Sequence, residues 1–511
     1  MISLPSLLEI LPEAKGLRVE DVPVISVTDH SGRVQEGAVF VAVCGASADG
    51  HDYLDQVVNK KPAAIIAQRK GPAEYEGLWI QVPDTRLVLG RLAARFAGDP
   101  ADSMVVVGVT GTNGKTTVTH FIHALFEKSM IKAGMIGTIK INDGSGLRGA
   151  THTTPGAVEM QSILKTMKEN RCKAITMETS SHGLEQGRCG GIAFNVGVFL
   201  NLTQDHLDYH KTMEQMGEND GDGVAVINID DLAGEKLAAE FSGRLKVITF
   251  GFSAGADFRA SEVRPSIRGQ VFALEARGKS FLVRLPVVGR FNVLNALAAM
   301  ASVSSTGVPL RDLVKAVGEI RQTPGRMEFV GGDRVSVFVD YAHTPDALEK
   351  ACETLSDLHP NRLITIFGCG GDRDRSKRPL MAEAASRHSQ FCIVTSDNPR
   401  SEEPQAIIDE TTPGLGSARH EVVIDRREAI YSTIENALPG DLILIAGKGH
   451  ETYQEVNGKR QYFDDREVAR RALEIRKKKE EVEFEKRQAE REERERKRIK
   501  EDDGERHFHQ E

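Results

Sequence analysis

The sequence lacks the patterns that would assign it to several common classes of protein. Its 6 cysteines are scattered without CxxC or CxxH spacing, which predicts reduced, mostly structural thiols in a cytosolic protein. No run approaches the roughly 20 apolar residues that span a bilayer, and the first residues lack the basic and apolar regions of an export signal. The formal net charge is −8, whereas nucleic-acid binding leaves a basic footprint. We therefore expect a cytoplasmic protein that neither spans a membrane nor binds nucleic acid.

The length of the chain and its clusters of turn-forming residues predict three domains and a tail. The 511 residues give room for about three domains of ordinary size. Strand-like runs alternate with helical stretches, which is typical of α/β folds with parallel sheets. Breaker clusters at 98–103 and 323–326 divide the chain. We predict an N-terminal domain over 1–100, a central mononucleotide-binding domain over 101–326 and a Rossmann-like domain over 327–473.

The tail over 474–511 differs from the rest of the chain in composition. It is rich in Lys, Arg and Glu, with only scattered apolar residues. Acid–base pairs four residues apart support a solvated helix, but no apolar face is present for packing. We predict a frayed helix or a disordered segment and favour both over a partner-binding element.

The most informative stretch reads Gly111-Thr112-Asn113-Gly114-Lys115-Thr116-Thr117. It follows an apolar, β-branched run over 104–110 and precedes helical spacing over 118–126, so it lies between a predicted strand and a predicted helix. Glycines let backbone N–H groups surround phosphate oxygens, the lysine neutralises charge and the threonine hydroxyl can hold Mg²⁺. The strict eight-residue pattern is not met, because Val109 stands where its first glycine belongs. The context nevertheless predicts that the chain binds a nucleoside triphosphate.

Polar clusters follow two later apolar runs. Glu178 ends the run 174–178, and a carboxylate at the end of a strand near a phosphate loop suits Mg²⁺ coordination; the alternative is a surface glutamate. Residues 201–210 read Asn-Leu-Thr-Gln-Asp-His-Leu-Asp-Tyr-His after the run 196–200, which favours metal and substrate binding over structural histidines. Asn292 and Asn295 begin an alanine-rich helical stretch, where helix capping is the alternative.

These motifs, in this order, resemble those of the Mur ligases, which are ATP-dependent amide ligases of peptidoglycan precursor synthesis. The shared motifs are the phosphate loop, Glu-x-Ser-Ser-His-Gly-Leu from Glu178, Asp-His-Leu-Asp-Tyr-His from Asp205, Asn-x-x-Asn-Ala-Leu-Ala-Ala from Asn292, and Asp-Tyr-Ala-His-Thr-Pro from Asp340. The resemblance covers about residues 20–473. It is strongest to members that add meso-2,6-diaminopimelate to UDP-N-acetylmuramoyl-L-alanyl-D-glutamate through an acyl phosphate.

The resemblance implies a role for each matching residue. It implies that ATP is bound by Gly111, Thr112, Asn113, Gly114, Lys115, Thr116, Thr117, Asn292, Arg326 and Asp340. The implied UDP-muramoyl-peptide-binding residues are Ser31, Thr153, Thr154, Ser180, Gln186 and Arg188. The implied diaminopimelate-binding residues are Arg373, Asp397, Asn398, Pro399, Arg400, Gly447 and Glu451. Thr116, Glu178 and His206 are the implied Mg²⁺ ligands, and Lys115, Glu178 and His206 the implied catalytic residues. We expect a monomer whose partners are small-molecule substrates.

The choice of amino acid depends on Asp397-Asn398-Pro399-Arg400. Similar enzymes that add lysine usually lack the arginine. Diaminopimelate carries a second amino-carboxylate group at its far end, and an arginine can bind a carboxylate in a bidentate manner. The alternative for Arg400 is a surface salt bridge.

One family feature is missing from the sequence after His210. Similar enzymes continue through a helix whose lysine becomes carbamylated and helps to position a second Mg²⁺. Here residues 211–216 lead into the Gly/Asp-rich stretch 217–223 and then into the predicted strand 224–228. We predict a flexible loop, a defective second metal site and reduced turnover. Two alternatives therefore stay open: a catalytically impaired homologue that binds nucleotide, and a folylpolyglutamate-synthase-like ligase.

Overall fold

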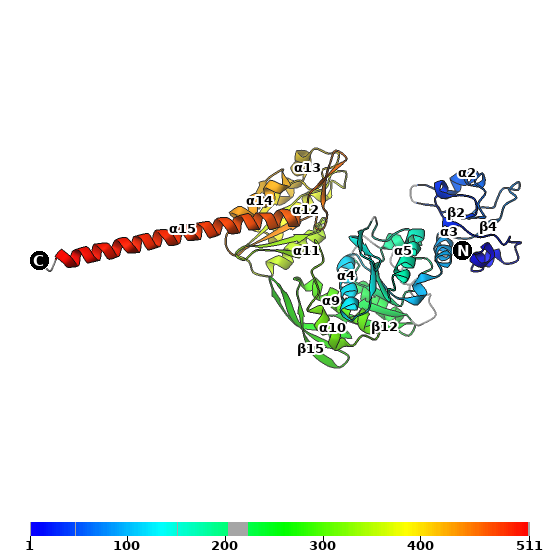
Figure 1. Ribbon diagram of the computed structural model, residues 1–511, viewed down its shortest axis with the longest axis horizontal. Coiled ribbons are helices and arrows are strands. Elements are labelled where there is room, and N and C mark those ends of the chain that lie inside the picture. The colour runs from blue at the N-terminus through cyan, green and yellow to red at the C-terminus, as the bar shows by residue number, and fades with distance from the viewer. Residues whose placement is uncertain (1, 46–47, 151, 203–222, 509–511) are drawn as a thin grey trace. The chain divides into compact units, whose positions relative to one another are not determined.

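The computed structural model describes residues 2–45, 48–150, 152–202 and 223–508 (Figure 1). The chain forms two compact units. The first unit comprises Met1–Arg264, Gln270–Pro286 and Arg290–Arg321, and the second comprises Pro265–Gly269, Val287–Gly289 and Gln322–Glu511. Within the described ranges, no helix is long and apolar enough to cross a membrane.

The first unit begins with a small parallel sheet. Its strands are β1 (Ser26–Thr28), β2 (Ala38–Val41), β3 (Ala64–Ala67) and β4 (Trp79–Gln81), in that order. Side chains alternate between its faces, as strand geometry requires. Val39 and Val41 pack with α1 (Leu4–Leu8) and α3 (Thr85–Ala97), whereas Phe40 packs with α2 (Leu54–Val58). The sheet is therefore covered by helices on both faces.

A larger sheet forms the rest of the first unit. Its strand order is β15-β14-β13-β12-β11-β10-β5-β9-β6-β7-β8. The bounds are β5 (Val105–Thr110), β6 (Ala133–Ile136), β7 (Lys140–Asn142), β8 (Leu147–Gly149), β9 (Ala174–Glu178), β10 (Val196–Phe199), β11 (Val224–Asn228), β12 (Lys246–Gly251), β13 (Phe258–Ser266), β14 (Gly269–Ala276) and β15 (Lys279–Leu285). The six strands from β12 to β6 in this order are parallel. The β-branched runs predicted as buried strands lie in this parallel part.

Two pairs of helices pack on the large sheet. α4 (Lys115–Lys128) and α9 (Arg290–Ser305) pack on one another and contact β5, β9, β10 and β11. A separate apolar cluster joins α5 (Ala157–Glu169) and α8 (Leu232–Phe241) to Ile175 and Met177 of β9. α10 (Leu310–Val317) follows α9 and packs beside it.

The parallel register brings three loops to one edge of this sheet. Val109 of β5 pairs with Glu178 of β9 on one side and with Val198 of β10 on the other. Since the three strands run in the same direction, the residues that follow them leave the sheet at the same edge. The segments after Thr110, Glu178 and Phe199 therefore share one edge.

The second unit holds a six-stranded sheet of order β16-β17-β21-β18-β19-β20. Its strands are β16 (Glu328–Gly331), β17 (Ser336–Asp340), β18 (Arg362–Phe367), β19 (Phe391–Val394), β20 (His420–Val422) and β21 (Asp441–Ala446), and all but β16 are parallel. α11 (Pro345–Ser356), α12 (Lys377–His388) and α13 (Pro404–Thr411) share one core cluster with the sheet, and α14 (Arg426–Asn436) and α15 (Asp465–Phe508) share another. A hairpin of β22 (Tyr453–Val456) and β23 (Lys459–Tyr462) lies between β21 and α15.

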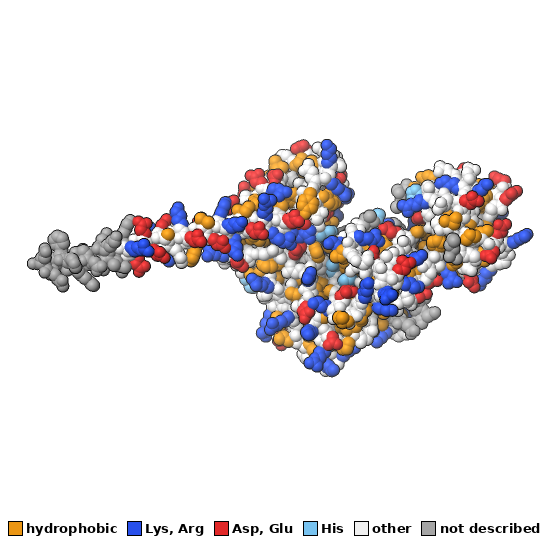
Figure 2. Space-filling view, in the orientation of Figure 1, with side chains coloured by type: hydrophobic (Ala, Val, Ile, Leu, Met, Phe, Trp, Pro, Cys, Tyr) orange, Lys and Arg blue, Asp and Glu red, His pale blue; other side chains and the backbone are white. Residues whose placement is uncertain are grey.

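The charged tail is part of α15, a continuous helix of 44 residues. Its first turns bury Val468, Ala469 and Ala472 in the core of the second unit. The Arg476 guanidinium then donates to the carbonyl of Ala437 at 2.7 Å, beyond the last turn of α14, as basic residues do at helix C-termini. From Lys477 to Arg496, Lys, Arg and Glu side chains intersperse along the helix (Figure 2). The predicted tail is thus helical and is anchored at its start by a neighbouring helix.

Candidate active site

The predicted phosphate loop follows β5 and ends where α4 begins at Lys115. Gly111 and Gly114 have φ of 144° and 91°, a region that residues with a Cβ rarely adopt. A Cβ on Gly114 would also lie 2.7 Å from the amide oxygen of Asn295. The Lys115 ammonium donates to the carbonyls of Gly111 at 2.6 Å and Thr112 at 3.0 Å. The lysine therefore lies over the loop at the N-terminus of a helix, where anions are favoured.

Asn201, two residues after the end of β10, hydrogen-bonds to the phosphate loop. Its side-chain oxygen accepts from the N–H of Asn113 at 2.9 Å, and its side-chain amide donates to the carbonyl of Asn113 at 3.0 Å. Its own carbonyl accepts from the N–H of Thr112 at 3.0 Å. The sequence places Asn201 in a polar cluster but does not predict this role. The one feature that could have predicted this contact is the position of Asn201 after a strand that pairs with β5.

Glu178 is buried at the end of β9 and accepts three hydrogen bonds. They come from the Thr116 hydroxyl at 3.0 Å, the Thr138 N–H at 2.8 Å and the Thr138 hydroxyl at 3.0 Å. Thr116 and Glu178, predicted from separate motifs, are thus in contact. A hydroxyl and a carboxylate are oxygen donors of the kind that Mg²⁺ prefers, so this pair fits the ion.

The proposed second-metal residues cannot be placed. His206, Asp205 and the stretch 211–222 lie outside the described residues. Within the part of the chain that is described, no three His, Cys, Asp or Glu residues group as a metal site. The predicted defect in a second metal site stays a prediction.

Five residues predicted to hold the muramoyl-peptide form one network beside Glu178. The Thr153 hydroxyl lies 3.1 Å from that of Thr138. The Thr154 hydroxyl donates to the Glu178 carbonyl at 3.0 Å and lies 3.1 Å from the Ser180 hydroxyl. The remaining two side chains, Gln186 and Arg188, bond to each other, and Arg188 also donates to the Thr154 carbonyl at 2.8 Å. The geometry therefore brings these residues together next to the phosphate loop.

A cavity of 770 Å³ opens within the first unit beside this network. Segments around the small sheet and loops of the central part of the chain line it, among them His30, Arg33, Arg86, Gln186 and Arg188. Three arginines in one polar cavity suit an anionic ligand. Ser31 begins the short helical turn Ser31–Arg33 between two of the lining residues, and its carbonyl accepts from Lys60 at 2.7 Å.

The three remaining predicted ATP residues belong to both units. Asn292, in the first turn of α9, is buried and accepts from the Asn295 side chain at 2.9 Å. Arg326 and Asp340 belong to the second unit, where the Arg326 guanidinium lies 4.8 Å from the centre of the Tyr341 ring. Asp340 accepts from the N–H of Met327 at 2.6 Å. Burial raises the pKa of Asp340 and outweighs the lowering effect of Arg326.

The residues predicted to bind diaminopimelate gather around a buried lysine. Lys448 donates to the side-chain oxygen of Asn398 at 3.0 Å and lies 3.1 Å from the Glu451 carboxylate. Asn398 also donates to Glu451 at 2.9 Å. Asp397 is buried beside Gly447, where an added Cβ would lie 2.6 Å from its carboxylate oxygen. The motifs predict Asp397, Asn398, Gly447 and Glu451 but not Lys448, although it lies between Gly447 and Glu451 in the chain.

Arg400 has an unusual backbone conformation, with φ of 51°. Such a conformation is rare for a long side chain and persists only when its surroundings fix it. Its N–H donates to the Glu455 carbonyl at 2.9 Å, and its carbonyl accepts from Asn457 at 2.6 Å. Its guanidinium donates to the carbonyl of Gly371 at 2.6 Å, and Arg373, two residues further along the same loop, is exposed. The alternative of an ordinary surface ion pair does not describe this environment.

Comparisons with known proteins agree on one family. A model described as "Mur ligase middle domain" matches residues 109–303, and one described as "Mur ligase, glutamate ligase domain" matches residues 325–449. A UDP-N-acetylmuramoyl-L-alanyl-D-glutamate–2,6-diaminopimelate ligase of Syntrophomonas wolfei is 41% identical over 467 residues, covering 89% of this chain and 95% of that protein. The same enzyme of Halalkalibacterium halodurans is 39% identical over 488 residues, covering 93% and 100%. A solved structure of a ligase with this name is 33% identical, with a TM-score of 0.69, and the match covers 93% of this chain and 99% of that one.

Proposed function

Because the chain belongs to the Mur ligase family, we propose that it joins meso-2,6-diaminopimelate to UDP-N-acetylmuramoyl-L-alanyl-D-glutamate at the expense of ATP. Relatives that share about two fifths of its residues over most of its length carry this name. The single observation that carries the choice of amino acid is the cluster of Arg400, Asn398, Lys448 and Glu451 in the second unit. Together with Arg373, this cluster offers positively and negatively charged side chains to a ligand that has an amino-carboxylate group at each end.

The chemistry requires a better leaving group than oxide on the D-glutamate side chain. The side-chain carboxylate attacks the γ-phosphorus of ATP, ADP leaves, and an acyl phosphate forms. The free amine of diaminopimelate then attacks the acyl carbon, the nitrogen loses a proton and inorganic phosphate leaves. Lys115 offsets the negative charge as the two anions approach, and the loop amides fix the phosphates.

Thr116 and Glu178 are the residues that would hold Mg²⁺. When bound, the ion supplies additional positive charge beside the ATP phosphates. Thr138 donates twice to Glu178, which fixes the orientation of the carboxylate. His206 is proposed as a ligand of a second ion from its motif alone.

The remaining substrate fits the cavity of the first unit. A UDP-sugar carries a diphosphate, and the cavity offers the guanidinium groups of Arg33, Arg86 and Arg188. We assign the uridine end to the Ser31 segment and the peptide end to the network around Thr154. The division into domains at residues 100 and 326, a cytoplasmic location and a monomeric state belong to the same proposal.

A reconstituted reaction tests this function. Full-length protein is incubated with ATP, Mg²⁺, UDP-N-acetylmuramoyl-L-alanyl-D-glutamate and meso-diaminopimelate, and the product mass is followed by mass spectrometry. The expected product is the UDP-tripeptide, with ADP release that requires both the dipeptide and diaminopimelate. Lysine in place of diaminopimelate is the specificity control. ADP release with folate substrates, and none with the dipeptide, would support the folylpolyglutamate-synthase-like alternative instead.

The segment after His210 supports a second candidate, an impaired homologue. Its sequence lacks the Tyr-x-x-Ala-Lys stretch that would present a carbamylated lysine. We expect nucleotide binding to persist while turnover is several orders of magnitude below that of intact relatives. Replacing residues 211–223 by a family-like helix with its lysine should restore kcat, whereas the same helix with alanine at that position should not. Full activity of the unmodified chain would contradict this candidate.

A further inference from the structure

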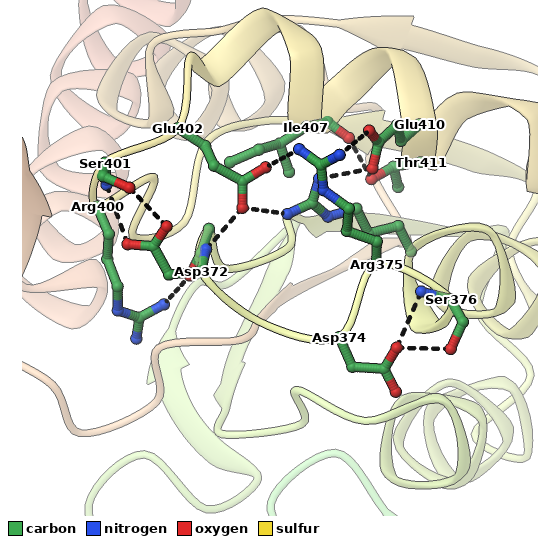
Figure 3. A network of polar contacts seen from close by, with 12 residues as sticks. Asp372, Asp374, Arg375, Ser376, Arg400, Ser401, Glu402, Ile407, Glu410 and Thr411 are labelled. Atoms are coloured by element: carbon green, nitrogen blue, oxygen red, sulfur yellow. Dashed lines mark hydrogen bonds and ion pairs between the residues drawn. The ribbon is translucent and has the colours of Figure 1, made fainter.

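Two loops of the second unit are joined by a compact network of charged residues (Figure 3). One loop contains Gly371 and Asp372 and follows β18, and the other contains Arg400 and Ser401 and follows β19. The proposed carboxylate-binding residues Arg373 and Arg400 lie on separate loops. Their separation is therefore set by whatever holds the loops together.

Glu402 is the centre of this network. One carboxylate oxygen accepts from the backbone N–H of Asp372 at 2.6 Å and from the Arg378 guanidinium at 2.7 Å. The other accepts from Arg375 at 2.8 Å. The Glu402 side chain is 15% exposed, and the Arg378 side chain is 2% exposed. Glu402 thus links its own loop directly to the backbone of the other loop.

Further contacts beside Glu402 show how closely the loops approach. Ser401 donates its hydroxyl to the Asp372 carboxylate at 2.6 Å. The N–H of Gly371 donates to the Asn398 carbonyl at 2.9 Å, and a Cβ added to Gly371 would overlap the carbonyl of Pro399. Asp372 and Arg400 both have positive φ, 54° and 51°. Both loops are therefore held in conformations that need external support.

We propose that Glu402 is a positioning residue that sets the spacing of Arg373 and Arg400 and so determines affinity for the second amino-carboxylate group of diaminopimelate. This inference rests on the proposed function for the identity of the ligand. The joining of the loops by Glu402 depends on the geometry alone. Small displacements of binding groups weaken recognition strongly, because charge-assisted hydrogen bonds depend on distance and direction.

Glu410 provides a matched control. It lies on α13 and accepts from the same Arg378 at 2.6 Å and pairs with the same Arg375 at 3.5 Å. Arg375 lies on the same loop as Asp372, but Glu410 contacts only its side chain and, unlike Glu402, accepts no bond from the Asp372 backbone. Glu402→Ala and Glu410→Ala each leave Arg378 with one carboxylate partner, so a purely structural role predicts similar effects for both.

The first measurement is backbone amide exchange in the full chain, followed by mass spectrometry without substrates. Glu402→Ala should increase exchange in peptides that cover 368–376 and 397–402, because the acceptor of the Asp372 N–H is lost. Glu410→Ala should leave these peptides near the wild-type rate. Glu402→Gln, which keeps an acceptor oxygen, should fall between the wild type and Glu402→Ala. Equal exchange in the two alanine variants would overturn the proposal.

The second measurement is steady-state kinetics of the same variants. Glu402→Ala should raise KM for diaminopimelate about 10- to 100-fold, with KM for ATP and for the UDP-dipeptide unchanged. Glu410→Ala should leave all three values near wild type, and Glu402→Gln should recover part of the loss. A parallel change in all three KM values, or the same change in both alanine variants, would overturn the proposal.

The two measurements separate this inference from the proposed function. A wild-type chain that forms no product with diaminopimelate overturns the proposed function and the ligand named here. Amide exchange would then still decide whether Glu402 joins the loops. A wild-type chain that forms the product, with unchanged kinetics in Glu402→Ala, overturns the positioning role alone.

Discussion

The phosphate loop and the proposed amino-acid pocket position their residues in different ways. The phosphate loop is one contiguous stretch, and its shape follows from two glycines, a strand and a helix N-terminus. The amino-acid pocket is assembled from three separate segments around residues 371, 398 and 448, which side-chain bonds connect. A contiguous site depends on local backbone conformation, whereas an assembled site depends on contacts between distant parts of the chain. The two should therefore respond differently to mutation and to acid.

The largest expected effect concerns the lysine of the phosphate loop. Lys115→Ala should lower kcat for UDP-tripeptide formation by about three orders of magnitude, because a preorganised charge beside the transferring phosphoryl group is lost. Circular dichroism should show an unchanged fold. Lys128→Ala, at the far end of the same helix, removes only an exposed ion pair with Glu319 and should leave kcat near wild type. Turnover close to wild type in Lys115→Ala would remove the catalytic role from the loop.

The corresponding test of the amino-acid pocket is Arg400→Ala. Losing a charge-assisted contact should weaken the binding of diaminopimelate by about 2–4 kcal/mol. The loss is measured as a decrease in kcat/KM for diaminopimelate, while KM for ATP stays nearly unchanged. Arg387→Ala, which removes an exposed arginine paired with Glu349 and Glu383, is the control. If the wild type uses lysine as readily as diaminopimelate, the recognition role of Arg400 is wrong.

Asn201 tests whether the phosphate loop is as self-contained as its sequence suggests. Asn201→Ala removes two side-chain bonds to Asn113 and should weaken ATP binding by about 1–2 kcal/mol. Binding of a non-hydrolysable ATP analogue, measured by calorimetry, gives the value. An unchanged affinity would mean that the loop keeps its shape without the neighbouring strand, which would sharpen the contrast with the amino-acid pocket.

The smallest expected effect is the response of the second unit to acid. Hydrogen bonds from Arg378 and Arg375 lower the pKa of Glu402 from 4.5 to about 2. A carboxyl group with a lowered folded-state pKa stabilises the fold above pH 4.5, and this contribution is lost as the pH falls towards 2, because the unfolded chain takes up the proton first. The urea concentration at the unfolding midpoint should therefore fall less between pH 5 and pH 3 in Glu402→Gln than in the wild type. The same pH dependence in both proteins would contradict the lowered pKa.

Much of the fold followed from local patterns. The strands Ala174–Glu178 and Val224–Asn228 have the bounds that their apolar runs predict, because buried parallel strands are continuous apolar segments. The antiparallel extension by β14 and β15 was not predicted, and the tail, predicted as a frayed helix or a disordered segment, is a continuous helix. The strands of this hairpin are partly exposed, so they are not continuous apolar runs. The start of the tail is held by a hydrogen bond from Arg476 to the carbonyl of Ala437, which lies 39 residues earlier in the chain.

The sequence by itself determined the phosphate loop, the Glu178 strand end and the segments that carry the amino-acid pocket. Each of these is a short motif whose chemistry does not depend on which strands become neighbours. Only the tertiary structure decided that Asn201 fastens the loop, that Lys448 joins Asn398 to Glu451, and that Glu402 holds the Asp372 backbone. The Asn201, Asn398 and Glu402 contacts cross 88, 50 and 30 residues of chain. Local sequence patterns do not predict such contacts, since these arise from the strand order and from loops that meet at one edge of a sheet.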